Sequence, residues 1–145
     1  MKNLMLMMLA VLPLQAISSD PSGDALVVFD LNVMSDGVQL AEPRVAARAE
    51  PGEKVMIMQG LDNGDAAQVE FRLESVSDAS AVIHATYAYG PEDQPATLGE
   101  TEFALEWGKP FELRFQRDAH SPVMRYSVTA SRSDFEAFMK TMRGK

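Results

Sequence analysis

Two methionines and two histidines carry the most distinctive chemistry of this sequence. Met56 and Met58 are two positions apart, so on a β-strand both thioethers point to the same side. Thioether sulfur favours Cu(I), and imidazole nitrogen is a further copper ligand. The candidate metal ligands are therefore Met56, Met58, His84 and His120. The alternative is that the methionines are ordinary core filling.

The histidines lack the sequence surroundings of an enzyme active site. His84 lies inside an alternating apolar segment, and His120 precedes Ser121-Pro122. Neither has a neighbouring motif that would activate a nucleophile, and glycine-rich phosphate loops and GxSxG are absent. The chain has no cysteine, which excludes cysteine nucleophiles, thiolate metal sites and thiol redox chemistry. We therefore predict a protein that is not an enzyme and needs no cofactor.

The chain is acidic, with a formal net charge of −8 at pH 7. Acidic surfaces repel phosphate backbones and anionic lipids, so nucleic acid is not an expected partner. A basic protein, a cationic peptide or a metal ion suits this field better. Acidity also keeps an exported protein soluble without any specific partner.

Residues 1–18 have the order of a secretory signal peptide. Lys2 supplies a positive charge, residues 4–12 form an uncharged apolar run, and Ala16-Ile17-Ser18 offers small residues for cleavage. The apolar run is shorter than the roughly 20 residues of a typical transmembrane helix. We predict cleavage after Ser18, a linker over residues 19–24 and one domain over residues 25–145, without membrane insertion. An uncleaved membrane anchor is the alternative.

Apolar residues recur at every second position through most of the predicted domain. This period is typical of strands with one buried face. The alternating segments are residues 27–33, 44–49, 54–59, 68–74, 81–89, 101–107, 111–116 and 124–128. About eight such strands, joined by short turns, predict an all-β fold: a single antiparallel β-sandwich or a partly open barrel.

Residues 54–59 differ from the other segments because both faces are apolar. Val55 and Ile57 fall on one face, and Met56 and Met58 fall on the other. Strands covered on both sides have this composition, so we predict a central or doubly covered strand.

Asn63-Gly64 follows this strand and is typical of a β-hairpin turn. It predicts that residues 54–59 pair with residues 68–74. The surrounding Asp62 and Asp65 lack the ligand spacing of a calcium loop.

The apolar period changes to that of a helix at the C-terminus. Apolar side chains at helical spacing form one stripe, made of Phe135, Phe138, Met139 and Met142. Ser133 and Glu136 have the spacing of a capping box. We predict a short α-helix at about residues 134–142 that packs on one face of the sheet, close to Met56 and Met58.

One local stretch resembles a known family. Pro43-Arg44-Val45, followed by Gly52-Glu53-Lys54-Val55-Met56-Ile57, resembles a strand pair in the secretin channels of the outer membrane and in related exported β-domains. The likeness covers residues 43–60. It implies an exported β-module close to envelope machinery and implies no functional residue.

These observations predict an exported, periplasmic β-domain that binds another envelope protein through a sheet edge or an acidic face. A bacterial periplasm suits an exported chain without disulfides. A periplasmic copper carrier and an inhibitor of a basic target protein are the alternative functions.

Overall fold

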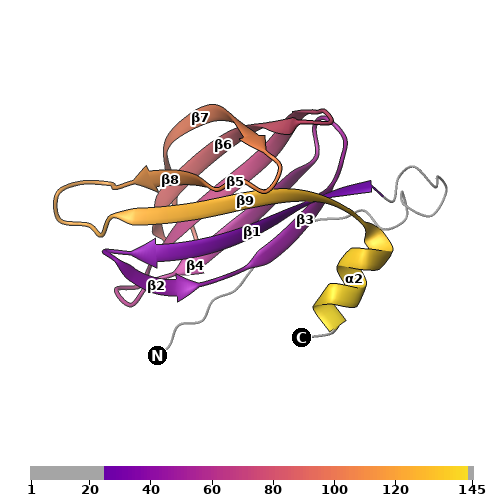
Figure 1. The fold of residues 1–145 in the computed structure, drawn as a ribbon. Coiled ribbons are helices and arrows are strands. Elements are labelled where there is room, and N and C mark those ends of the chain that lie inside the picture. The colour runs from indigo at the N-terminus through magenta and orange to yellow at the C-terminus, as the bar shows by residue number, and fades with distance from the viewer. Residues whose placement is uncertain (1–24, 144–145) are drawn as a thin grey trace.

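The protein is a sandwich of two antiparallel β-sheets with a short helix at its C-terminal end (Figure 1). The computed structural model describes residues 25–143. The two sheets do not join into a closed barrel. The predicted sandwich is therefore confirmed, with nine strands in the described range instead of about eight. The predicted signal peptide and linker lie outside the described residues.

The first sheet contains five strands in the order β2-β1-β9-β8, and β3 pairs with β1 beside β2. Pro43 separates β2 from β3, and its carbonyl oxygen accepts a hydrogen bond from Leu31 N over 3.0 Å. Because proline has no backbone N–H to donate, the hydrogen-bond ladder along this edge is interrupted between β2 and β3. The strands are β1 (Ala25–Ser35), β2 (Val38–Ala41), β3 (Arg44–Arg48), β8 (Phe111–Phe115) and β9 (Met124–Asp134).

The second sheet is a four-stranded meander in the order β4-β5-β6-β7. The predicted hairpin is confirmed, since β4 pairs with β5 and Gly64 has a φ of 89° in the turn. Asn63 Oδ1 supports this turn by accepting a hydrogen bond from Asp65 N over 2.9 Å. The strands are β4 (Lys54–Gly60), β5 (Asp65–Val76), β6 (Ser80–Pro91) and β7 (Ala96–Glu106).

The core lies between the two sheets, where the inward residues of each strand interdigitate. Phe29 of β1 and Phe71 of β5 meet across the sandwich with ring centroids 5.4 Å apart. Burial of these alternating side chains is the main driving force of the fold. The largest fully buried side chains are Tyr89, Tyr126, Phe29, Phe71, Leu26, Ile57, Leu73, Ile83, Leu105 and Met124.

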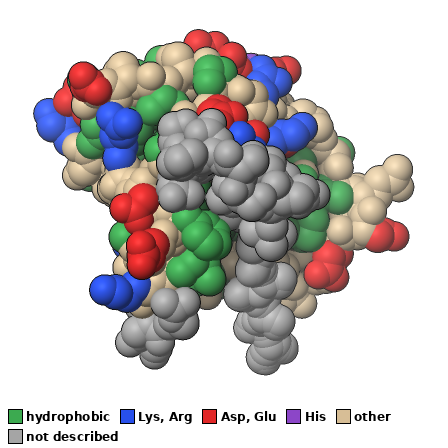
Figure 2. All heavy atoms as spheres, turned by 90° about the vertical axis from the view of Figure 1, so that its right-hand side faces the viewer, with side chains coloured by type: hydrophobic (Ala, Val, Ile, Leu, Met, Phe, Trp, Pro, Cys, Tyr) green, Lys and Arg blue, Asp and Glu red, His purple; other side chains and the backbone are tan. Residues whose placement is uncertain are grey.

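The helix α2 (Phe135–Arg143) covers part of the outer face of the first sheet. Phe135 and Phe138 pack on a separate buried cluster formed by Leu26, Val28 and Ala46. β1 is therefore covered on both faces at its N-terminal half. Figure 2 views this side of the molecule and shows hydrophobic side chains in separate patches, with acidic and basic side chains between and around them.

Two predictions about this helix are wrong. It packs on the first sheet and not beside Met56 and Met58, which lie on β4 of the second sheet. The capping residue is Asp134 and not Ser133, because Asp134 Oδ1 accepts a hydrogen bond from Ala137 N over 2.7 Å. Ser133 instead continues the β9 ladder opposite Leu26. The helix thus begins one residue later than predicted.

The prediction of a doubly covered strand at residues 54–59 is also wrong. β4 is the edge strand of the second sheet, and Met56 is 39% exposed on its outer face. The doubly covered strand is β1. Among residues 25–143, no helix has the length and apolar character needed to cross a membrane.

Candidate functional site

The structure places the four candidate metal ligands on separate elements. Met56 and Met58 lie on the outer face of β4, and His84 lies on the outer face of β6. β5 separates the two strands, which puts their backbones roughly 10 Å apart. The exposed His120 belongs to the loop between β8 and β9. No group of three or more His, Asp or Glu side chains within residues 25–143 is arranged to hold a metal ion.

Each histidine has a local contact of its own. His84 Nε2 lies 2.6 Å from Glu100 Oε1 on the neighbouring strand β7. His120 contributes its backbone N–H, which donates a hydrogen bond to Asp118 Oδ1 over 2.9 Å. This contact is the main reason why the pKa of Asp118 is lowered from its usual value. The four residues are not brought together into one site.

Ion pairs cover the outer face of the second sheet. Lys54 pairs with Glu70 on the adjacent strand, and Arg72 pairs with Glu74 two residues further along β5. Such exposed pairs each contribute little stability. Most charges on this face are therefore already matched within the protein.

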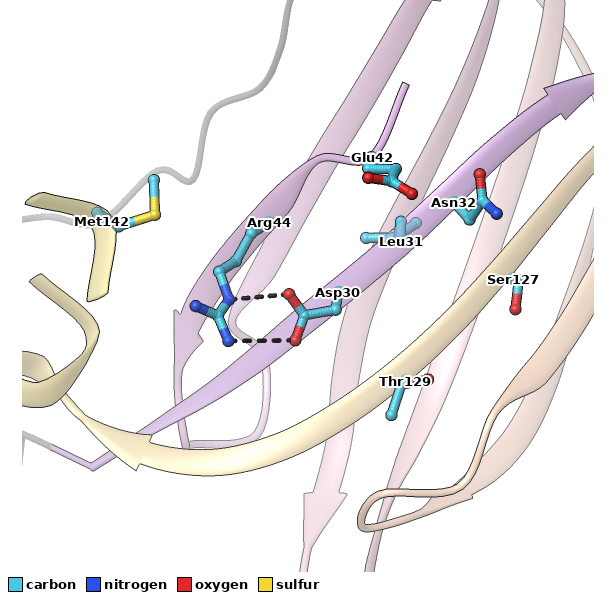
Figure 3. A pocket seen from close by; sticks show the side chains of 8 residues that line it. All are labelled: Asp30, Leu31, Asn32, Glu42, Arg44, Ser127, Thr129 and Met142. Carbon is cyan, nitrogen blue, oxygen red and sulfur yellow. Dashed lines mark hydrogen bonds and ion pairs between the residues drawn. The ribbon is translucent and has the colours of Figure 1, made fainter. Parts of the chain in front are cut away.

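One hollow of about 450 Å³ lies on the outer face of the first sheet, beside α2 (Figure 3). Among its described lining residues, Arg44 is the only cation, and Asp30 faces it: Arg44 Nε lies 2.8 Å from Asp30 Oδ1, and Nη2 lies 3.4 Å from Oδ2. The pair satisfies both charges, so this hollow offers no free cation to an anionic ligand. Its other polar residues are Asn32, Glu42, Ser127 and Thr129.

A second hollow, which we call the cleft, lies between β2 and the end of β4. It has a volume of about 390 Å³. Leu40 comes from β2, Leu61 follows β4, and Pro122 comes from the loop between β8 and β9. Three segments that are distant in the sequence thus form its apolar walls.

Gln59 is the buried polar residue of the cleft. It is the last inward-facing residue of β4 and is only 3% exposed. Its Nε2 donates a hydrogen bond to the adjacent Gly60 O over 2.9 Å. No residue of the described range donates a hydrogen bond to its Oε1. The cleft therefore has an unused hydrogen-bond acceptor in its wall.

Three carboxylates surround the Gln59 end of β4. Asp36 and Asp62 line the cleft. Glu92 lies beside Gly60, where a Cβ on that glycine would come 3.7 Å from Glu92 Oε2. Unlike Glu70, Glu74 and Glu100 of the outer face, these three form no ion pair with any residue in the 25–143 range. The end of β4 therefore carries unmatched negative charge.

Within the described part of the chain, the backbone of β4 also has no strand paired with it on one side. Leu73 N donates to Glu53 O, and Leu61 N donates to Asp65 O, each over 2.8 Å. Bonding residues alternate in an antiparallel ladder, so Val55, Ile57 and Gln59 bond to β5. The N–H and C=O groups of Lys54, Met56 and Met58 consequently point away from the sheet. We call this row of groups the β4 edge.

The other sheet edges carry features that prevent pairing with another chain. β7 presents the exposed acidic residues Glu100, Glu102 and Glu106, and its pairing with β6 contains an irregularity. The β2–β3 edge is interrupted at Pro43, and β8 has only five residues. Charges, prolines, irregularities and short length all protect edges. β4 has Lys54 at its start and, in the rest of the strand, none of these features.

Neither the β4 edge nor the cleft was predicted from the sequence. The absence of charges from Val55 to Met58 was visible, but the same pattern fits a covered strand. The cleft assembles from separate loops and has no local sequence signal. Comparisons with protein-family models, curated proteins and solved structures give no match to this chain, so the geometry alone supports a functional conclusion.

Proposed function

We propose that this protein is a non-enzymatic binding module of the bacterial cell envelope. It takes an extended segment of a partner protein onto the β4 edge, as an additional strand of the second sheet. The observation that carries this proposal is the unprotected β4 edge, whose outward side chains Met56 and Met58 are uncharged. In strand addition, main-chain hydrogen bonds supply affinity and alternate side chains supply specificity.

The two faces of β4 define what the added segment must look like. Val55 and Ile57 point into the core, so the neighbouring inward side chains of the partner are apolar. Met56 and Met58 lie on the outer face and contribute flexible thioethers, which adapt to different neighbours. An extended segment with alternating apolar residues fits this edge.

The envelope location rests on residues 1–18 and on the absence of cysteine. The measurement that tests it is the intact mass of the protein recovered from a periplasmic fraction. We expect a chain that begins at Ser19. A chain that begins at Met1 would contradict the location proposed here and support a membrane anchor.

A short probe peptide tests the proposed binding mode. In acetyl-Thr-Arg-Thr-Val-Thr-Val-Thr amide, aligned antiparallel to β4, the two valines lie opposite Ile57 and Val55. The arginine lies opposite Gln59. Affinity is measured by fluorescence anisotropy of the labelled peptide with the purified protein.

Met56→Pro and Met56→Thr form a matched pair for this measurement. Proline removes the outward N–H of residue 56 without removing a hydrogen bond to β5. Threonine keeps that N–H and favours strands. We expect Met56→Pro to weaken binding about tenfold or more, since the ring also blocks close approach, and Met56→Thr to leave it nearly unchanged.

Thermal unfolding of both variants verifies that the sandwich is intact. The proposal fails if the unmodified protein does not bind the peptide. It also fails if a folded Met56→Pro variant binds as tightly as Met56→Thr.

A further inference from the structure

We propose that the cleft binds the cationic end of an arginine or lysine side chain carried by the segment that adds to β4. This inference rests on the proposed strand addition and names the residue class that the cleft selects. Three observations support it: the position of the cleft along β4, its unmatched acceptors and its apolar walls.

The cleft lies where the inward side chains of an added strand would end. Along β4 the inward positions are Val55, Ile57 and Gln59, and the last of these lines the cleft. A segment antiparallel to β4 therefore places apolar side chains beside Val55 and Ile57. Its next inward side chain, opposite Gln59, enters the cleft.

The polar lining of the cleft includes the hydroxyl of Ser35 and the amides of Gln39 and Asn63, and beside them stand acceptors that have no cationic partner in the 25–143 range. Gln59 Oε1 lies in the wall, while Asp36 and Asp62 carry charge at the opening. Asp36 uses Oδ1 to accept a hydrogen bond from Val123 N over 2.9 Å, which fixes the position of its carboxylate. Glu92 does not line the cleft, but its carboxylate lies beside Gly60 at the same end of β4 and adds negative charge there. Acceptors of this kind suit a guanidinium or an ammonium group.

A metal ion does not fit this arrangement. Within the described range, no three or more acidic or histidine side chains are grouped so that they could hold a metal ion. A guanidinium group presents several N–H donors in a fixed fork and reaches separate acceptors at the same time. The apolar walls from Leu40, Leu61 and Pro122 match the aliphatic stem of such a side chain.

The test compares peptides that differ only at the residue opposite Gln59. The arginine peptide described above is compared with its lysine and citrulline analogues. Citrulline has nearly the shape of arginine but no charge. We expect the arginine and lysine peptides to bind about tenfold more tightly than the citrulline peptide, because hydrogen bonds to charged groups are stronger. Added salt is expected to reduce the difference.

Two triple variants locate the charge preference. Asp36→Asn, Asp62→Asn and Glu92→Gln together remove the two carboxylates that line the cleft and the one beside Gly60. Glu100→Gln, Glu102→Gln and Glu106→Gln together remove the same amount of charge from β7. We expect the first set to abolish the preference for arginine over citrulline and the second set to leave most of it.

The possible outcomes separate this inference from the proposed function. If the arginine and citrulline peptides bind equally tightly, and Met56→Pro abolishes the binding of both, the proposed role of the cleft is wrong and strand addition to β4 is supported. If the two triple variants reduce the preference for arginine over citrulline equally, the proposed role of the cleft is also wrong. If no peptide binds, both proposals fail.

Discussion

The sandwich has two lateral sides, one between β7 and β8 and the other between β4 and the β2–β3 edge, and they differ in their side chains. On the β7–β8 side, Phe103 and Phe111 stack with ring centroids 4.0 Å apart and an angle of 7° between the planes. Tyr87 and Phe115 stack nearby at 4.9 Å. On the opposite side, the strands β2, β3 and β4 contain no aromatic residue. The cleft lies on this side, between β2 and the end of β4.

The aromatic side stabilises the fold, and the β4 side is the one that we propose binds a partner. Aromatic pairs bury large areas and fix the relative position of the two sheets. The side that they close is thus filled by the protein itself. The side with β4 keeps an open backbone edge and acceptors that no residue in the 25–143 range pairs with.

The largest expected effect comes from the closed side. Phe103→Ala removes the stack with Phe111 and an edge contact with Phe71, and we expect the free energy of unfolding to fall by about 3 kcal/mol. Leu40→Ala on the open side, where Leu40 is 37% exposed, is expected to cost less than about 1 kcal/mol. Urea unfolding measures both variants. Equal losses would contradict the proposed division between the two sides.

A smaller effect is expected at a buried polar group of the core. Tyr126 packs against Phe115, and its hydroxyl has no hydrogen-bond partner in the described part of the chain. Burial raises the pKa of this hydroxyl, which therefore stays neutral at ordinary pH. Tyr126→Phe removes an unsatisfied buried group, so we expect the free energy of unfolding to rise by about 1 kcal/mol. Peptide binding should not change.

Gln59→Met is the matched change on the open side. It replaces the amide by an apolar side chain of similar length, and we expect stability to change by less than about 1 kcal/mol. The preference for the arginine peptide over citrulline should fall several-fold, because one acceptor of the cleft is lost. The proposed difference between the two sides is wrong if Tyr126→Phe alters the preference for arginine over citrulline, or if Gln59→Met leaves that preference unchanged.

The sequence predicted the fold class well because alternation is a local signal. The strands from Gln68 to Glu74 and from Met124 to Val128 show one apolar face in the sequence and one buried face in the structure. The Asn63-Gly64 turn was equally local. For these elements, short-range chemistry decides the structure.

The sequence could not assign the covered strand, because covering depends on tertiary contacts. β1 and β4 are both apolar on two faces, with Leu26 and Val28 in one and Met56 and Met58 in the other. α2 begins directly after β9, which is the neighbour of β1 in the first sheet, so it covers β1. That position follows from the strand order, which alternation does not reveal. The cleft was missed for the same reason.

The central claim is that the β4 edge binds an added strand, and amide hydrogen exchange tests it most directly. The exchange rates of the Lys54, Met56 and Met58 amides are measured with and without the arginine peptide. We predict that these three amides, which point away from the sheet in the free protein, become slow to exchange when the peptide is bound. The amides of β7 should keep their rates. Protection on β7 with no change on β4 would contradict the claim.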